Sequence, residues 1–155
     1  MPLYAGPSYC HQDVCIGSPD LERLSTAPKV ADILDAATFY LNTAPTRSDI
    51  YYFCIYQQGT PIGQIILHDI DWQTGESLVA YHLFLPEYRG RGKGTTALAL
   101  LQRYVRSATP LTRLVLITSR DNPASQRIAA KCQFELLGPA REDPEQLLVF
   151  AWDVS

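Results

Sequence analysis

The residues with the clearest chemical potential form a short glycine-rich, basic loop near the middle of the chain. It holds three cations, Arg89, Arg91 and Lys93, alternating with three glycines, Gly90, Gly92 and Gly94. A helix start leaves backbone N–H groups unpaired and carries partial positive charge, so it attracts anions. Glycine lets an anion come close to the backbone. If a helix follows this loop, the expected ligand is a phosphate or pyrophosphate.

The segments on both sides of the loop predict the strand and the helix that such a site needs. Leu78 to Leu85 is a nearly continuous apolar run that stops at Pro86, which indicates a strand buried on both faces. After the loop, apolar residues between 97 and 108 recur at helical spacing. The unit is therefore strand, glycine-rich loop and helix, and it favours anion binding over a simple turn.

Two motifs resemble one family of enzymes. Arg89 to Gly94 fits the (Q/R)xxGx(G/A) signature of the GNAT superfamily of N-acetyltransferases, where this loop holds the pyrophosphate of acetyl-coenzyme A (acetyl-CoA). The preceding YHLFLPEYRG resembles the family's fourth strand. Asp121 to Phe134, DNPASQRIAAKCQF, resembles a later family segment that begins N-x-x-(A/S) and runs through a short helix. The order of the motifs along the chain also matches the family.

The resemblance implies how acetyl-CoA is held. In the family the fourth and fifth strands are parallel and splay apart, and the pantetheine arm enters the wedge and bonds to the backbone of the fourth strand. Here that backbone belongs to His82, Leu83, Phe84 and Leu85. The pyrophosphate is expected at Gly90 to Thr95, beside Arg89. Asn122 and Ser125 are expected to line the far wall.

The reaction implied is direct attack of an amine on the thioester within a ternary complex. It needs a group that takes the amine's proton and a donor near the thioester oxygen. Strand alternation puts Leu78, Ala80 and His82 on one face. His82 is the titratable side chain among them, with an ordinary pKa of about 6.5, and is the candidate catalytic residue. Many family members carry a tyrosine as general acid seven residues after the asparagine, but that position here is Ala129.

The acceptor is less well defined than the cofactor. The NPAS motif at Asn122 more closely resembles the branch that acetylates protein N-termini, ribosomal proteins among them. The acidic residues Asp69, Asp71 and Glu76 either attract a cationic amine or form a solvated hairpin. Three tyrosines of one expected strand either pack in the sheet or contact the acceptor: Tyr51, Tyr52 and Tyr56. A small-molecule amine and a protein N-terminus both stay open, as do monomer and homodimer.

The rest of the chain predicts a single GNAT-like α/β domain over residues 1–155, with an irregular start at 1–13. Besides the central unit, strands are expected at 50–56, 62–70, 114–118, 134–137 and 147–152, and Val14 to Ile16 are expected to join the edge of the sheet. A helix start is expected at 18–22, and helices at 28–41 and 122–132. They predict a mixed, mostly antiparallel sheet of roughly six or seven strands. Helices are expected on both faces, and strands four and five are expected to be parallel.

Composition narrows the possible partners. The chain is 46% hydrophobic and 19% charged, and its net charge of -3 argues against general nucleic-acid binding. No apolar run spans a bilayer and no signal-peptide pattern is visible, so the expected location is the cytoplasm. Cys54 and Cys132 lie in apolar contexts typical of buried thiols. Cys10, His11 and Cys15 have no second cluster to complete a zinc site, so no metal is expected.

Two alternatives from other functional classes remain open at this stage. Gly92, Gly94 and Ala97 also satisfy the G-x-G-x-x-A form of a dinucleotide-binding (Rossmann) fingerprint, which would make the protein an oxidoreductase. However, the strand ends too early for that motif, and the preceding elements read as antiparallel hairpins. The missing tyrosine leaves a second alternative, a catalytically idle module that binds acyl-CoA without turnover.

Overall fold

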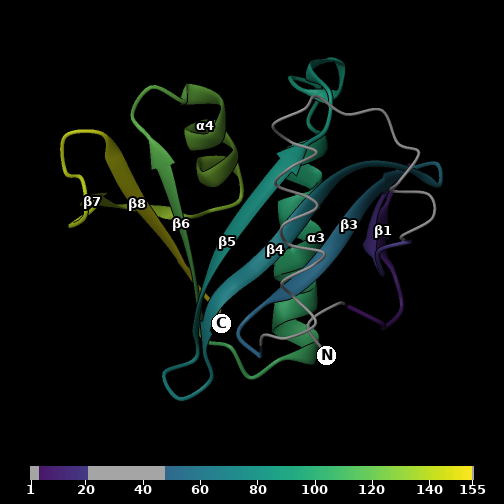
Figure 1. The fold of residues 1–155 in the computed structure, drawn as a ribbon, viewed down its shortest axis with the longest axis horizontal. Coiled ribbons are helices and arrows are strands. Elements are labelled where there is room, and N and C mark those ends of the chain that lie inside the picture. The colour runs from purple at the N-terminus through teal and green to yellow at the C-terminus, as the bar shows by residue number, and fades with distance from the viewer. Residues whose placement is uncertain (1–3, 21–47, 155) are drawn as a thin grey trace.

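An eight-stranded mixed sheet organises the chain, and a computed structural model describes residues 4–20 and 48–154 of it. The strands lie in the order β1-β2-β3-β4-β5-β6-β8-β7, and every neighbouring pair is antiparallel except β5 and β6 (Figure 1). The strands are β1 Tyr9–His11, β2 Val14–Gly17, β3 Tyr51–Gln57, β4 Thr60–Asp71, β5 Glu76–Leu83, β6 Arg113–Ser119, β7 Glu135–Pro139 and β8 Leu147–Asp153. The described helices are α3 Lys93–Ala108, α4 Pro123–Lys131 and the 3-10 turn η2 Pro86–Tyr88.

The N-terminal segment is more ordered than its sequence predicts. Val14 to Ile16 join the sheet as expected, because β2 pairs with β3, but the irregular start expected over residues 1–13 contains a further strand, β1, which forms a hairpin with β2. A disulfide joins Cys10 and Cys15, which stand opposite each other across the hairpin. Tyr9 packs edge-on against Tyr104 of α3, with the ring centroids 5.6 Å apart. The sheet therefore has eight strands instead of the expected six or seven.

Three consecutive antiparallel strands lead into the glycine-rich loop, as the sequence predicts. β3 and β4 form one hairpin, and β4 and β5 form the next. The pairing of β4 with β5 is regular from Gly63 to His68 and is then interrupted by an irregularity between His68 and Asp71. Within it, Asp69 has a φ of 50°, which is unusual for a residue other than glycine.

β5 and β6 are parallel and separate after a short paired region, as expected of the family's fourth and fifth strands (Figure 1). They pair from Glu76 to Leu78 on β5 only. β5 then continues to Leu83 without a partner on that side, while β6 pairs with β8 along its length. The prediction that residues 78–85 are buried on both faces is wrong, because His82 is exposed and Leu78 and Ala80, on the same face, are only partly buried.

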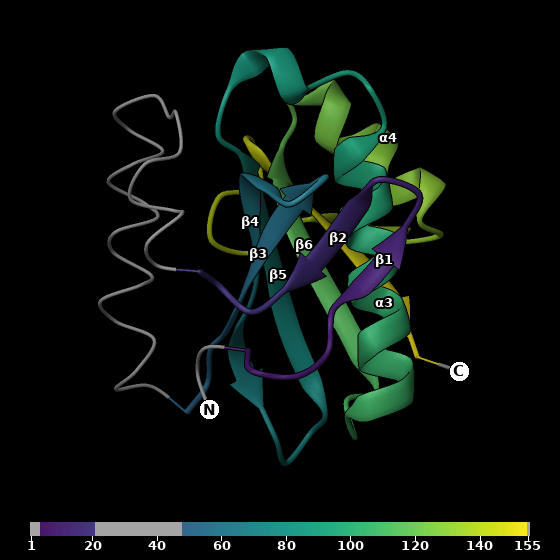
Figure 2. The ribbon, with the colours of Figure 1, turned by 90° about the vertical axis from the view of Figure 1, so that its right-hand side faces the viewer.

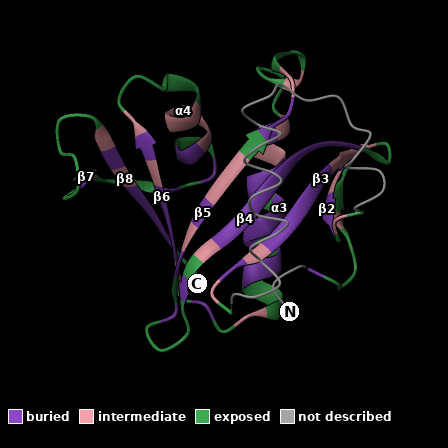
Figure 3. Cartoon of the chain, viewed as in Figure 1, coloured by how far each residue is buried: buried purple, intermediate pink, exposed green. Residues whose placement is uncertain are grey.

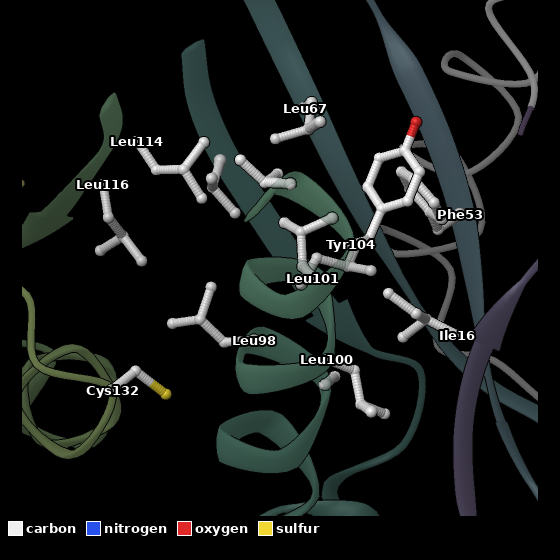
Figure 4. Packing of buried hydrophobic residues seen from close by; sticks show 14 of the residues in the cluster. Ile16, Phe53, Leu67, Leu98, Leu100, Leu101, Tyr104, Leu114, Leu116 and Cys132 are labelled. Atoms are coloured by element: carbon white, nitrogen blue, oxygen red, sulfur yellow. The ribbon is translucent and has the colours of Figure 1, made fainter. Parts of the chain in front are cut away.

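The hydrophobic core lies between the sheet and α3, whose apolar positions face the strands (Figures 3 and 4). Ala97, Leu98, Leu101 and Val105 of α3 have no exposed surface, as the helical spacing predicts. Burying such side chains stabilises a fold by roughly 1.5–3 kcal/mol each for the larger ones. Cys54 and Cys132 are buried free thiols, which confirms that expectation.

Both described helices longer than one turn lie on the same side of the sheet (Figure 2). α4 follows β6 and packs close to α3, where a Cβ on Gly94 would meet Ile128 at 3.1 Å. The helix expected at 28–41 lies outside the described residues. So does most of the helix expected at 18–22, and its described part, Ser18 to Asp20, is not helical.

Candidate active site

The glycine-rich loop connects β5 to α3 through backbone conformations that suit glycine. Gly90 and Gly92 have φ values of 73° and 78°, where a side chain would be strained. Gly92 is the residue that precedes α3, and no side chain caps that helix start. The first turn contains no acidic residue either. Its unpaired N–H groups are therefore available to an anion, and the basic side chains of the loop add to the attraction.

A cavity of about 910 Å³ begins at this loop and extends into the opening between β5 and β6. It brings together most of the side chains expected at the cofactor site. From β5 it is lined by His82 and Leu83. From the loop and the start of α3 it is lined by Arg89, Gly90, Gly92, Gly94 and Thr95. Asn122 and Ser125 form part of its opposite wall, at the start of α4.

Four of the expected cofactor residues do not line the cavity. Phe84 is fully buried, and its N–H donates to Ile62 O at 2.8 Å, so this group is committed to the sheet. Leu85 already belongs to the turn that starts η2. Arg91 and Lys93 lie in the loop but outside the cavity lining, so they act on it only through their charge.

Leu83 shows which backbone groups of β5 face the opening. Because Phe84 N–H points toward β4, alternation turns the N–H and C=O groups of Leu83 and Tyr81 toward the gap between β5 and β6. A contact from the loop supports this orientation of the Leu83 carbonyl, because Arg89 Nη2 donates a hydrogen bond to Leu83 O at 3.4 Å. The backbone edge available to a ligand therefore centres on Tyr81 and Leu83.

The start of α4 forms the opposite wall through two polar residues. Asn122 caps the helix, with Oδ1 accepting a hydrogen bond from Ser125 N at 3.1 Å. Ser125 Oγ lies 2.9 Å from Tyr81 OH, so a hydrogen bond spans the gap between β5 and α4. Burial raises the pKa of Tyr81, so its hydroxyl stays protonated at neutral pH. The sequence reasoning missed Tyr81, because it lies on the face of β5 opposite to His82.

Ala129, which occupies the position of the family's usual tyrosine, does not face the cavity. It has no exposed surface and belongs to the core cluster. The neighbouring Ile128 and Arg127 line the cavity instead. A hydroxyl at position 129 would therefore point into the core in this chain.

The acidic residues of the β4–β5 hairpin do not act as one cluster. Asp71 Oδ1 accepts hydrogen bonds from the N–H groups of Gln73 and Thr74 at 2.9 and 3.1 Å, so its carboxylate holds the turn. The N–H groups of Thr74 and Gln73 lower the pKa of Asp71. Asp69 instead contacts His68, with Oδ2 2.7 Å from Nδ1. His68, for which the sequence made a weaker case as a base than for His82, also lines the cavity.

The tyrosines of β3 mainly serve the structure. Tyr52 is fully buried and its hydroxyl donates to Gln64 Oε1 at 2.8 Å. Tyr56 OH donates to Ser18 O at 2.7 Å and ties the end of the N-terminal hairpin to the sheet. Tyr51 packs edge-on against Trp72. None of the three lines the main cavity within the described part of the chain.

Cys10 and Cys15 are joined by a disulfide, so their sulfur atoms are not available, together with His11, as thiolate ligands of a metal. Across residues 4–20 and 48–154, no three His, Cys, Asp or Glu side chains come together as a possible metal site. None of the helices in the same part of the chain is both long and apolar enough to cross a membrane.

Solved structures of acetyltransferases share this fold. The ribosomal L7/L12 alpha-N-protein acetyltransferase RimL, in complex with coenzyme A, superposes with a TM-score of 0.77 at 14% identity, covering 96% of this chain and 98% of RimL. The microcin C7 self-immunity acetyltransferase MccE, bound to acetyl-CoA and AMP, gives 0.74 at 17% identity, covering 93% and 94%. Spermidine N-acetyltransferase from Vibrio cholerae, bound to CoA and spermine, gives 0.74 at 14%, covering 92% and 96%. At these identities the likeness shows the fold alone.

The sequence itself matches a family model. No curated protein is similar enough to be matched, but the model of the acetyltransferase (GNAT) domain matches residues 11–135, most of the chain. The antiparallel strands that precede the loop are not those of a Rossmann fold, so the dinucleotide alternative loses its structural basis. The chain therefore belongs to the acetyltransferase (GNAT) family, whose members transfer an acetyl group from acetyl-CoA to an amine.

Proposed function

We propose that this protein acetylates a primary amine, with the N-terminal amine of a peptide as the leading acceptor class, by direct attack on acetyl-CoA. The observation that carries the proposal is the continuous cavity of about 910 Å³, which joins the glycine-rich loop to the gap between β5 and β6. One end suits a pyrophosphate. The other end lies where a thioester and an amine would meet.

The residues present fit acetyl-CoA. The start of α3 has no side-chain cap and no acidic residue in its first turn, and Gly90 and Gly92 leave open space beside the backbone. This end therefore suits the pyrophosphate, assisted by Arg89 and by the charges of Arg91 and Lys93. Gly94 and Thr95 complete the helix start.

The pantetheine arm is expected to run along the open edge of β5. The backbone N–H and C=O groups of Leu83 and Tyr81 point out from this edge into the gap. His82, Phe84 and Leu85 are their neighbours along the chain. Asn122 and Ser125 line the opposite side at α4. The Tyr81–Ser125 hydrogen bond spans this route, so we expect it to open or to rearrange when the arm enters.

In the proposed reaction, the amine nitrogen forms a bond to the thioester carbon and the bond from carbon to sulfur breaks. A backbone N–H of β5 is the candidate donor to the oxygen on which negative charge develops. His82 is one candidate for the group that takes the amine's proton, since it is exposed and lines the cavity. The leaving thiolate needs no tyrosine at position 129 if it takes its proton from Ser125, Tyr81 or water.

The acceptor class rests on two arguments. The NPAS start of α4 resembles the branch that acetylates protein N-termini, and the similar structures include an alpha-N-protein acetyltransferase. They also include a spermidine N-acetyltransferase, so a polyamine is the competing acceptor. Among the described residues, Asp69 is the acidic side chain that hydrogen-bonds to the cavity-lining His68, whereas Arg89, Arg127 and Lys131 line the cavity itself, which does not suit a polycation.

The cofactor assignment is tested by calorimetric titration with acetyl-CoA and, separately, with NAD, using wild type and Gly92→Asp. The aspartate places a side chain and a negative charge beside the expected pyrophosphate, so acetyl-CoA should bind at least ~10-fold more weakly, which is about 1.4 kcal/mol. The matched control is Gly138→Asp on β7, where φ is also positive and the surroundings are also empty. The control should strain the backbone at least as much, since its φ of 133° suits a side chain less well than the 78° of Gly92, and it should leave acetyl-CoA binding unchanged.

The assignment is wrong if wild type does not bind acetyl-CoA, or if Gly92→Asp binds it as tightly as the control does. Release of free thiol, measured with a panel of peptides with free N-termini and with spermidine, then tests the acceptor. Faster release with peptides supports the proposed class, and faster release with spermidine replaces it. Binding of acetyl-CoA without any acceptor-dependent release would instead indicate an idle binding module.

A further inference from the structure

His68 lies at the closed end of the opening between β5 and β6. Leu78 pairs with Val115, and this is the last pair before the two strands separate. On the other side of β5, Leu78 stands opposite His68 of β4. Side chains opposite each other in an antiparallel pair lie on the same face. His68 therefore lies on the face of the sheet that carries Leu78, Ala80 and His82, and it lines the same cavity as the glycine-rich loop.

Asp69 is positioned to orient this histidine. Successive residues of a regular strand point to opposite faces, so an aspartate following a histidine would normally point away from it. Here the irregularity between His68 and Asp71 and the φ of 50° at Asp69 break the alternation. Asp69 Oδ2 reaches His68 Nδ1 at 2.7 Å. A residue other than glycine adopts this conformation at some cost, which is commonly tolerated where geometry serves a function.

The contact determines what His68 can do. Because Asp69 accepts only from a protonated Nδ1, it favours the neutral tautomer in which Nε2 is the basic nitrogen. The His68 side chain is 22% exposed, while that of Asp69 is 65% exposed and open to solvent. A half-buried imidazole that is oriented by a carboxylate and borders a substrate cavity has the arrangement of a general base.

We propose that His68, oriented by Asp69, takes the proton from the attacking amine, directly or through one water molecule. The proposal rests on the proposed function. As the nitrogen bonds to the thioester carbon, its proton passes to Nε2 of His68 and the electron pair of the broken bond leaves on the thiolate sulfur. The imidazolium then returns its proton to solvent or to the thiolate. Asp69 is a positioning residue, and it stabilises the imidazolium while that charge exists.

The charged and titratable groups around His68 in the described part of the chain come from the neighbouring strands and from the cavity lining. On the strands next to it, Asp71 and Glu76 form the pair beyond the irregularity, and Asp49 O accepts from Ile70 N. The carboxylate of Asp71 is held by the turn. On β6, Arg113 binds Asp153 through its guanidinium at 2.8 Å. Asp69 is therefore the charged side chain that hydrogen-bonds directly to His68, while Arg89, Arg127, Lys131 and His82 line the same cavity.

The kinetic test compares His68→Gln and Asp69→Asn with His82→Gln, and uses His11→Gln on β1 as the matched control away from this cavity. With the best acceptor found for wild type, His68→Gln should lower kcat/KM by ~10² or more, the usual effect of losing a general base. The Kd for acetyl-CoA should stay unchanged. Asp69→Asn should lower kcat/KM less than His68→Gln does, because the imidazole stays in the cavity but loses the carboxylate that orients it.

A change in folding alone would lower the fraction of active protein without moving the pH profile, so the profile separates the two explanations. The proposal is overturned if His68→Gln keeps both kcat/KM and its pH profile. It is also overturned if His82→Gln, and not His68→Gln, removes the histidine-dependent limb. Failure of the protein to bind acetyl-CoA in calorimetry would instead reject the proposed function itself.

A second measurement does not need an acceptor. Nuclear magnetic resonance of the protein with ¹⁵N-labelled histidine should show His68 with its proton on Nδ1, and Asp69→Asn should alter that signal. The His68 signal should differ between the protein saturated with acetyl-CoA and the protein saturated with CoA, because the two ligands differ only by the acetyl group. His11 should not respond. A His68 signal that is identical in both complexes would place the thioester elsewhere and reject the assignment.

Discussion

The side chain of Gln64 is a fully buried amide whose nitrogen lacks a hydrogen bond partner among the described residues. Gln64 has no exposed surface, and its Oε1 accepts from Tyr52 OH at 2.8 Å. Its Nε2 has no hydrogen bond partner among the described residues. Gln64 also stands opposite His82 in the sheet. The side chain is therefore already costly to bury, and it depends on the hydroxyl of Tyr52.

Tyr52→Phe should lower the free energy of unfolding by about 1–3 kcal/mol, because it leaves a buried amide oxygen without its donor. Urea unfolding measures the change. Tyr51→Phe on the same strand is the matched control, since its hydroxyl makes no hydrogen bond to the described residues, and it should change little. Adding Gln64→Leu to Tyr52→Phe should recover part of the loss. Equal effects of the two phenylalanine variants would contradict this account of Gln64.

At the residue scale, the sequence could predict those site residues whose role depends on local motifs. Asn122 caps α4 and Gly92 precedes α3 because both roles follow from the residues next to them in the chain. The partnership of His68 with Asp69 could not be predicted in this way. It depends on a break in strand alternation that is visible only once β4 is paired with β5. Tyr81 lies on the face of β5 opposite to His82, and its partner Ser125 is 44 residues away in sequence, so local motifs did not indicate it either.

At the scale of elements, α4 presents different faces to the cavity and to the core. Asn122 and Ser125 lie at its first turn and line the cavity, whereas Ala129 has no exposed surface and packs in the core. The next residue, Ala130, is exposed. The helix therefore has no room for a large side chain at 129, and restoring the family's usual tyrosine there should not restore a general acid.

Ala129→Tyr should destabilise the protein by about 1–3 kcal/mol or more, because a large side chain is forced into a packed core. Ala130→Tyr provides the matched control on the same helix and should change stability by less than about 0.5 kcal/mol. Thermal or urea unfolding of both variants makes the comparison. A stable Ala129→Tyr with a raised kcat would show that position 129 can reach the reacting atoms after all.

The elements themselves were largely predictable, because their hydrophobic periods are clear. The strands at β3, β4, β6 and β8, and both described helices, lie where the sequence places them within a few residues. The prediction that β5 is buried on both faces was wrong for a physical reason. An apolar run such as residues 78–85 does not reveal that its neighbour leaves after three residue pairs and leaves the edge of β5 open to a ligand.

At the scale of the whole molecule, the divergence of β5 and β6 divides the sheet into two parts that meet at the closed end of the cavity. β1 to β5 form one part, and β6, β8 and β7 form the other. α3 lies against the first part and α4 against the second (Figure 1). The GNAT resemblance predicted this arrangement from two motifs. The hairpin that adds β1 to the edge of the sheet was not predicted, because its residues are too few and too irregular in composition to indicate a strand.

The disulfide between Cys10 and Cys15 should stabilise this edge but should not be needed for the fold. In the loop-entropy account, closing so short a loop contributes about 2 kcal/mol. The hairpin is also held by other contacts with α3, including Tyr9 OH to Ser107 Oγ at 3.3 Å and Arg103 Nη2 to Cys10 O at 3.3 Å. These contacts do not depend on the oxidation state of the two cysteines.

Replacing both cysteines by serine should therefore lower the free energy of unfolding by about 2 kcal/mol and leave acetyl-CoA binding unchanged, because the hairpin lies away from the main cavity. Urea unfolding of wild type with and without a thiol reductant measures the same contribution without mutation. The serine pair should be insensitive to the reductant, which controls for effects on Cys54 and Cys132, both of which are buried thiols. If the reductant does not change the stability of wild type, the hairpin is held by its contacts with α3 alone. If it abolishes acetyl-CoA binding, the N-terminal edge and the cofactor site are coupled through α3, the helix that contacts both.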